Sequence, residues 1–141
     1  MEKVYKVLTR NDTGETHSHQ SGITIPKKVA ETTIFPKLGI DKLNPRTELL
    51  FFDEEGKMWC FQYIYYNDVF HGKERSKAHN EHRLTCVKDY IRANNIKSGD
   101  SIWFGIDLHG VRKIGFVSNS EDKNEGTTVI KLGYGWKYIN I

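Results

Sequence analysis

Residues 48–66 read ELLFFDEEGKMWCFQYIYY, and this stretch decides the fold that we expect. Two runs rich in aromatic and large apolar residues, 48–52 and 57–66, stand on either side of the polar segment 53–56. Runs of this kind, joined by a short turn-forming segment that contains a glycine, are typical of a β-hairpin. The stretch therefore predicts two neighbouring antiparallel strands.

The rest of the chain predicts more short strands. Runs of aromatic and β-branched residues bounded by turn formers lie at 3–9, 23–25, 101–106, 111–118, 127–132 and 135–141. One-sided apolar patterns predict two short helices, at 27–34, where Pro36 closes the helix, and at 87–94. We expect a mainly β fold of about seven short strands with two short helices, arranged as a small barrel or half-open barrel, because a flat sheet of this size would leave its edges exposed.

Length and composition fit a single domain over residues 1–141. Of the 141 residues 38% are hydrophobic and 28% charged, which supports one core. No apolar stretch approaches the ~20 residues that cross a bilayer, and no signal peptide is evident, so we expect a cytoplasmic protein without membrane contact. Cys60 and Cys86 are too few for a disulfide framework, and we expect both thiols to be buried. The net charge of +3 is compatible with a polyanionic partner without requiring one.

Two long polar segments interrupt the strands, at about residues 10–22, which we call the N-arm, and about 71–83, which we call the C-arm. Loops this long in a compact domain are usually functional. Side chains that pair with base edges are the candidates for base reading: His19, Gln20, His79, Asn80, Glu81 and Arg83. Cationic and hydroxyl side chains are the candidates for contacts with the DNA backbone: Arg10, Thr13, Ser18, Ser21, Lys73, Arg75 and Lys77. The alternative is that each arm is an ordinary solvated loop.

Two further expectations concern charged and titrating residues of the arms. For Asp12 we expect a role in shaping the turn, because a carboxylate near a phosphate is unfavourable. A phosphate near a protonated imidazole raises its pKa, so we expect His79 and His82 to make DNA affinity rise as the pH falls from about 8 to 6. A metal site built from His17-x-His19, His79-x-x-His82 and Cys86 is the alternative, although this spacing is not that of a zinc site.

The arms and their surroundings resemble one known family. The N-arm region contains Asn11-Asp12-Thr13-Gly14-x-Thr16, then His19-Gln20-x-Gly22, and closes on Ile23-x-Ile25-Pro26. Further matching blocks follow in order: Leu43-Asn44-Pro45, Ile64-Tyr65-Tyr66-Asn67, Gly72-Lys73-x-Arg75 and Asn80-Glu81-His82-Arg83-Leu84-Thr85. Over roughly its first two thirds the chain thus resembles the EcoRII N-terminal, effector-binding domain of type II restriction endonucleases. Residues 89–91 and 96–104 are more similar to the B3 domains of plant transcription factors.

This resemblance implies a seven-stranded, B3-like pseudobarrel that grips double-stranded DNA from the major-groove side with both arms. It implies an effector or target-binding domain at the N-terminus of a longer restriction endonuclease. Such a domain has no catalytic chemistry and no cofactor of its own, since Mg²⁺ would serve only the attached nuclease domain. As an isolated domain we expect it to be monomeric. The chain departs from the family pattern at 17–18 and 76–79, where bases would be read.

Other functions remain as alternatives. Glu55-Gly56-Lys57 fits the E-x-K fragment of metal-dependent nucleases, with Asp41 or Asp53 as the upstream carboxylate, which would make a small magnesium-dependent nuclease. This fragment falls in the predicted hairpin loop, where its carboxylates would point into water. A protein-interaction barrel is the third possibility. We assign the strand aromatics to the core rather than to a base-stacking platform: Trp59, Phe61, Tyr63, Tyr65, Trp103, Phe104 and Phe116.

Overall fold

The described part of the chain forms one β-sheet with two short helices. The computed structural model describes residues 1–16, 22–39, 41–67, 80–119, 129–133 and 135–140. Within these residues nine strands lie in the order β2-β5-β4-β3-β7-β6-β1-β9-β8. The bounds are β1 (Glu2–Val7), β2 (Ile23–Ile25), α1 (Lys27–Ala30), β3 (Arg46–Phe52), β4 (Met58–Tyr66), β5 (Glu81–Thr85), α2 (Lys88–Ala93), β6 (Ser101–Ile106), β7 (Arg112–Val117), β8 (Val129–Gly133) and β9 (Trp136–Asn140).

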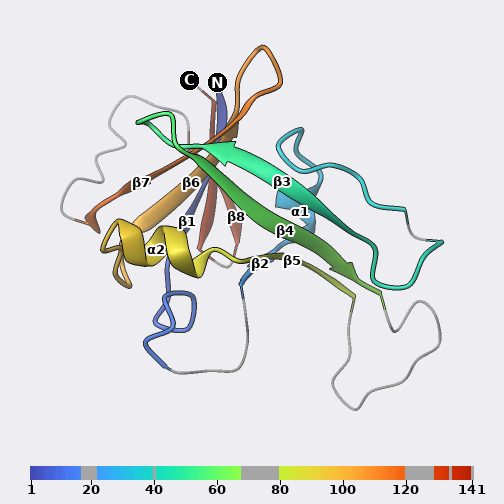
Figure 1. Cartoon of the computed structure of the whole chain (residues 1–141), viewed down its shortest axis with the longest axis horizontal. Helices are drawn as coiled ribbons and strands as arrows, with labels where there is room; N and C mark the ends of the chain where they lie inside the picture. Colours follow the sequence, from blue (N-terminus) through green and yellow to red (C-terminus); the bar gives the residue numbers. More distant parts are fainter. Residues whose placement is uncertain (17–21, 40, 68–79, 120–128, 134, 141) are drawn as a thin grey trace.

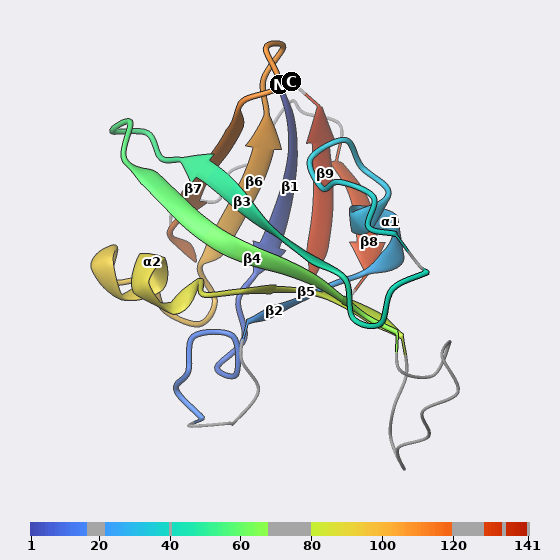
Figure 2. The same cartoon turned by 45° about the vertical axis from the view of Figure 1, so that its right-hand side comes forward.

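The sheet curls into an open half-barrel, which Figures 1 and 2 show from two sides. Neighbouring strands pair antiparallel, apart from β3 and β7, which meet in parallel at Phe52 and Lys113. β2 and β8 stand at the two ends of the strand order, so the described sheet does not close on itself. The predicted mainly β fold with two short helices is confirmed. The described residues contain nine strands where about seven are predicted.

β5 matches none of the predicted strand runs and lies where the sequence predicts the end of the C-arm. It pairs with β2 on one side and with β4 on the other, so that His82 stands between Ile25 and Tyr65. Its first three residues are polar and half-buried, and only Leu84 and Thr85 are buried. The apolar alternation that marks a strand is therefore missing, although His82 and Arg83 are paired with β2 on one side and with β4 on the other.

β3 and β4 form the predicted hairpin. Phe51 pairs with Trp59 and Leu49 with Phe61, which places these four side chains on the inner face, whereas Leu50 and Met58 are exposed. Asp53 closes the turn, because its Oδ1 accepts the backbone N–H groups of Glu55 at 2.9 Å and Lys57 at 2.8 Å. The hairpin tip and the end of β4 at Tyr66 therefore lie at opposite ends of a long ribbon (Figure 1).

The two helices are short. α1 ends at Ala30 rather than at Ile34, because the Thr32 hydroxyl donates to the Val29 carbonyl at 2.7 Å and competes with the helical backbone. Ile34 then packs into the core from the following segment and is fully buried. α2 matches its predicted range to within one residue at each end. Among the described residues, none of the helices has the length and apolarity needed to cross a membrane.

Aromatic side chains fill the half-barrel. The ring centroid of Phe104 lies 5.3 Å from that of Phe51 and 6.2 Å from that of Trp136. The assignment of the strand aromatics to the core holds in part. Four of these aromatic residues are buried: Phe61, Tyr63, Trp103 and Phe104. Trp59 and Tyr65 are half-buried, and Phe116 is 39% exposed.

Both cysteines are exposed, so the prediction of buried thiols is wrong. Cys60 stands at an outward position of β4, between Trp59 and Phe61, whose side chains pack on the inner face. Cys86 follows β5 with a φ of 70°, and this left-handed residue ends the alternation of the strand. The face that a strand residue occupies, and not its hydrophobicity, decides the exposure of the Cys60 thiol.

Candidate nucleic-acid interface

A groove of about 1060 Å³ joins the roots of the two arms. It lies on the side of the barrel from which residues 9–16 and the adjoining ends of β4 and β5 project (Figures 1 and 2). Its walls come from β1 and the following turn, from β2 and the start of α1, from the ends of β4 and β5, and from the start of β9. The residues are Lys6, Thr9, Asp12, Thr24, Ile25, Pro26, Lys27, Tyr65, Asn80, Glu81, His82, Arg83 and Trp136.

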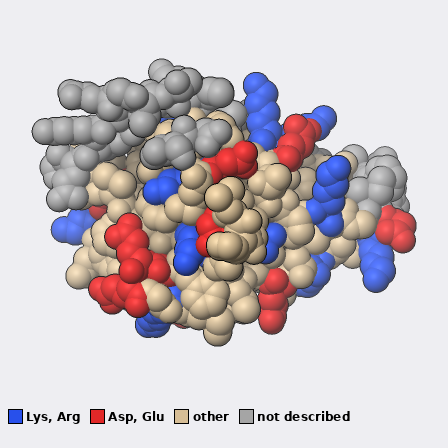
Figure 3. All heavy atoms as spheres, turned by 90° about the horizontal axis from the view of Figure 1, so that it is seen from above, with Lys and Arg blue, Asp and Glu red and all other residues tan. Residues whose placement is uncertain are grey.

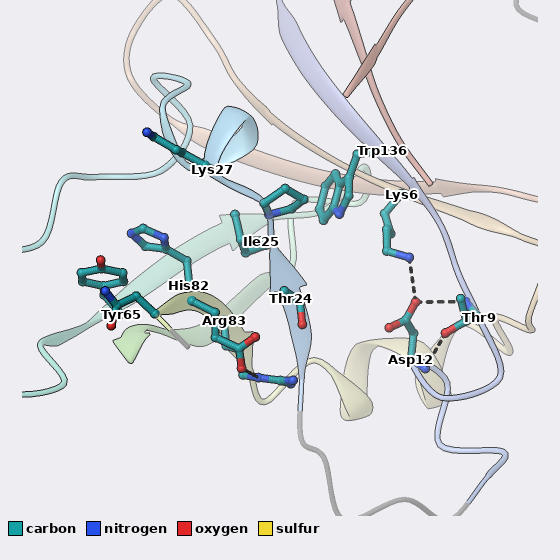
Figure 4. Close-up of a pocket in the computed structure, with 13 residues that line it drawn as sticks. Lys6, Thr9, Asp12, Thr24, Ile25, Lys27, Tyr65, His82, Arg83 and Trp136 are labelled. Atoms are coloured by element: carbon teal, nitrogen blue, oxygen red, sulfur yellow. Dashed lines mark hydrogen bonds and ion pairs between the residues drawn. The ribbon is translucent and has the colours of Figure 1, made fainter. Parts of the chain in front are cut away.

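Asp12 fastens the beginning of the N-arm to β1. Its Oδ2 accepts the Thr9 backbone N–H at 3.0 Å and pairs with the Lys6 ammonium at 3.1 Å, and its own N–H donates to Thr9 Oγ1 at 3.2 Å (Figure 4). The side chains of Lys6 and Asp12 are only 9% and 12% exposed. Asp12 therefore shapes the turn, as predicted, and Lys6 neutralises its charge inside the groove.

On the C-arm side, Arg83 pairs with Glu81. The two residues are two positions apart on β5 and share one face of the strand, and Arg83 Nε lies 2.9 Å from Glu81 Oε1. Their side chains are 13% and 22% exposed. In the ladder between β2 and β5, Thr24 stands opposite Arg83. Arg83 thus meets the groove with its Nε bonded to a carboxylate, which restricts the plane of the guanidinium group.

His82 lies flat against Tyr65, with ring centroids 4.3 Å apart and planes 20° from parallel. Tyr63 stacks on the same imidazole at 5.6 Å. Burial between these rings lowers the pKa of His82, because the charged form loses its hydration. This direction applies to the free protein, whereas the expected rise of DNA affinity with falling pH depends on the pKa in the complex and stays a prediction.

The structure brings only some of the predicted site residues together. Asn80, Glu81 and Arg83 line the groove. Arg10 is exposed and pairs loosely with Glu15 at 3.7 Å, and the Thr13 hydroxyl donates to the Arg10 carbonyl at 3.2 Å. The other candidates lie outside the described residues: Ser18, His19, Gln20, Ser21, Lys73, Arg75, Lys77 and His79.

Several residues that line the groove are not among the candidates from the sequence. Lys27 follows Ile25-Pro26 of a family-like block, and this position is the signal that could have indicated it. Trp136 has no such signal, because it enters the groove through the pairing of β9 with β1, where it stands opposite Lys6. Long-range strand pairing thus adds residues to the groove that local patterns do not mark.

The candidate nuclease fragment lies at the tip of the β3–β4 hairpin. Asp53 Oδ2 accepts the Trp59 indole N–H at 3.0 Å, and this bond, with those to the turn backbone, lowers the pKa of the Asp53 carboxyl. Glu55 and Lys57 are exposed beside it. Both oxygens of Asp53 thus accept hydrogen bonds, from the turn backbone and from Trp59 of β4, so this carboxylate does not simply point into water. In the part of the chain that the structure describes, no group of three or more His, Cys, Asp or Glu side chains is placed to hold a metal ion.

The face away from the arms carries charges of both signs (Figure 3). Seen from above, this face shows acidic and basic side chains interspersed over its described part (Figure 3). In the groove, three cationic residues, Lys6, Lys27 and Arg83, stand against the two carboxylates of Asp12 and Glu81.

The chain is similar to a known protein family and to proteins of known structure. The chain matches the family described as "Restriction endonuclease EcoRII, N-terminal" over residues 2–107. No curated protein matches it. One of 24 matching chains of known structure is that of the Arabidopsis FUS3–DNA complex, with a TM-score of 0.58 and 22% sequence identity over 79% of this chain and 92% of that chain. This likeness shows a shared fold, the open pseudobarrel of the plant B3 domains.

The family match runs from β1 to the end of β6 and covers well over half of the chain. It includes the positions of both arms and every groove residue except Trp136. The resemblance seen in the sequence is thereby confirmed. The chain belongs to the family of the N-terminal domain of the restriction endonuclease EcoRII.

Proposed function

We propose that this chain binds double-stranded DNA at one short preferred sequence, with both arms in the major groove. It would serve as the effector- or target-binding domain of a type II restriction endonuclease. The observation that carries the proposal is the groove between the arm roots, which the base-reading candidates Asn80, Glu81 and Arg83 line. Membership in the EcoRII N-terminal family supports it, as does the fold shared with a protein solved as a DNA complex.

The chemistry of the groove suits this partner. Each carboxylate in it pairs with a cation, Asp12 with Lys6 and Glu81 with Arg83, so neither presents an uncompensated charge to a phosphate. Lys27 is exposed at the start of α1 and adds positive charge. A cationic groove attracts the DNA backbone, whereas amide, carboxylate and guanidinium groups distinguish base edges.

The proposal assigns no catalytic step and no cofactor to these residues. Cleavage, with its requirement for Mg²⁺, would belong to a nuclease domain of a longer cytoplasmic enzyme. The alternative, a nuclease that uses Asp53, Glu55 and Lys57, has a direct test. Purified chain incubated with plasmid and Mg²⁺ should leave the DNA intact, and specific cleavage that Glu55→Ala abolishes would favour the alternative.

Selection of bound duplexes from a random pool tests the proposal. We expect a dissociation constant on the order of 10⁻⁸ M or tighter for the selected duplex and of roughly 10⁻⁴ to 10⁻⁶ M for a shuffled one. Arg83→Ala should cost about 1 to 3 kcal/mol on the selected duplex and little on the shuffled one. Met58→Ala, near the distant hairpin tip, is the control and should change neither. Equal affinity of the chain for every duplex would refute the proposal.

A further inference from the structure

Asn67 is fully buried at the end of β4, four residues before the C-arm begins. A buried amide needs partners for its polar atoms. Its Oδ1 accepts the backbone N–H of Asn44 at 2.7 Å, and its Nδ2 donates to the Lys42 carbonyl at 2.8 Å. Its own backbone N–H donates to Asn44 Oδ1 at 3.1 Å. Asn67 is thus bonded on three sides to the segment that precedes β3.

Asn44 completes a reciprocal pair with Asn67. Each side-chain oxygen accepts the backbone N–H of the other residue. Asn44 has a φ of 49°, a left-handed conformation that asparagine tolerates better than most residues. The pair lies just beyond the last rung of the β3–β4 ladder, Arg46 opposite Ile64, where Tyr65 N–H also donates to the Pro45 carbonyl at 3.0 Å. It therefore extends the hairpin past its regular end.

The position of this pair matters for the C-arm. At the far end of the arm, β5 holds Glu81 against β4, and His82 and Arg83 between β2 and β4. The Asn44–Asn67 pair fixes the near end, from which the chain leaves β4. Both asparagines stand in family-like blocks of the sequence, yet neither lines the groove.

We propose that Asn44 and Asn67 are positioning residues, which set the C-arm for sequence reading without touching DNA; this rests on the proposed function. An arm anchored at both ends loses less conformational freedom on binding, so the specific complex gains affinity. Non-specific binding depends on phosphate charge and needs no fixed arm. The pair should therefore govern the ratio of specific to non-specific affinity.

The experiment measures the affinities of variants for the selected and the shuffled duplex. Asn67→Ala should weaken binding to the selected duplex by about tenfold and change binding to the shuffled duplex by less than about twofold. Asn44→Gly keeps the left-handed backbone accessible and removes the side chain with its Oδ1 acceptor, so it should lower the ratio in the same direction. In the double variant the two losses should not add, because both break one pair.

Asp53→Ala is the matched control. Asp53 also bonds its side chain to backbone N–H groups, but at the other end of the same hairpin. This variant should lower the stability of the domain and leave the affinity ratio unchanged at a temperature where all variants are folded.

The outcomes separate the two proposals. If the unaltered chain prefers no duplex, the proposed function fails and the positioning role fails with it. If the unaltered chain is selective and both asparagine variants keep its full ratio, the positioning role alone is refuted. An equal loss on both duplexes also refutes it, because it indicates general disruption. Should Asn67→Ala fail to fold, the ratio measured for Asn44→Gly decides.

Discussion

At the scale of single residues, each carboxylate that lines the groove is paired with a cationic side chain. Asp12 and Lys6 lie 3.1 Å apart with little exposure, and Glu81 and Arg83 lie 2.9 Å apart. An unpaired carboxylate here would repel a phosphate, and an unpaired, partly buried charge is costly in itself. The pairs therefore place polar, directional groups in the groove while keeping it attractive to a polyanion.

His82 should make the stability of the free domain depend on pH. Burial lowers the pKa of its imidazole below the ordinary value of 6.5. Above that value the imidazole is neutral in the folded and the unfolded chain alike. As the pH falls below it, the unfolded chain takes up the proton first, so the free energy of unfolding decreases until the pH passes the folded pKa.

His82→Phe keeps a ring against Tyr65 and cannot titrate, so it should reduce this loss of stability. Urea unfolding at about pH 7.5 and pH 5.5 measures the effect. The control is His109→Gln, in the exposed turn between β6 and β7, which should keep the parent's pH dependence. A His82→Phe protein as sensitive to pH as its parent would show that another group causes the loss.

At the scale of elements, the pairing of β2 with β5 connects the ends of the two arms. The N-arm returns to the sheet at Gly22, directly before β2, and the C-arm returns in β5. Ile23 stands opposite Leu84, and Thr24 opposite Arg83. Gly22 has a φ of 84°, and a Cβ built on it would collide with the Leu84 carbonyl. Close contact between the two returning segments thus requires glycine at this position.

Gly22→Ala should therefore destabilise the domain by about 2 to 3 kcal/mol, through left-handed strain and displacement of the β5 backbone. Gly56→Ala is the matched control, because Gly56 has a φ of 82° but no described atom within 4 Å of the place where a Cβ would stand. Strain alone should cost about 1 kcal/mol there. Chemical denaturation measures both, and equal losses would contradict the proposed close contact.

At the scale of the whole molecule, we expect the basic side chains that contribute to DNA binding to lie on the side of the groove. Lys27 lines the groove, whereas Lys57 lies at the hairpin tip with its ammonium 4.2 Å from the centre of the Trp59 ring. Both are exposed lysines, so they differ mainly in position. The mixed charges on the face away from the arms give no second basic surface in the described part of that view (Figure 3).

Lys27→Ala should lower the slope of log affinity against log salt by about one unit, because one phosphate contact is lost. Lys57→Ala should leave the slope unchanged. Titrations of the shuffled duplex at several salt concentrations measure both slopes. A reduced slope for Lys57→Ala would place the DNA on a different face from the groove.

The sequence by itself determined the features that depend on neighbours along the chain. The β3–β4 hairpin follows from two aromatic runs around a turn, and Asp12 shapes its turn through Thr9, three residues away. Ordered blocks of residues indicated the family, and the family match over residues 2–107 confirms it. Such signals are local, and so a linear pattern carries them.

Only the tertiary structure decided what depends on pairing between distant segments. β5 is a strand because β2 and β4 flank it, although residues 81–83 are polar. Trp136 reaches the groove through the pairing of β9 with β1, Cys60 is exposed by its position in β4, and burial lowers the pKa of His82. Strand register sets the face on which each side chain lies, and register depends on partners remote in the sequence.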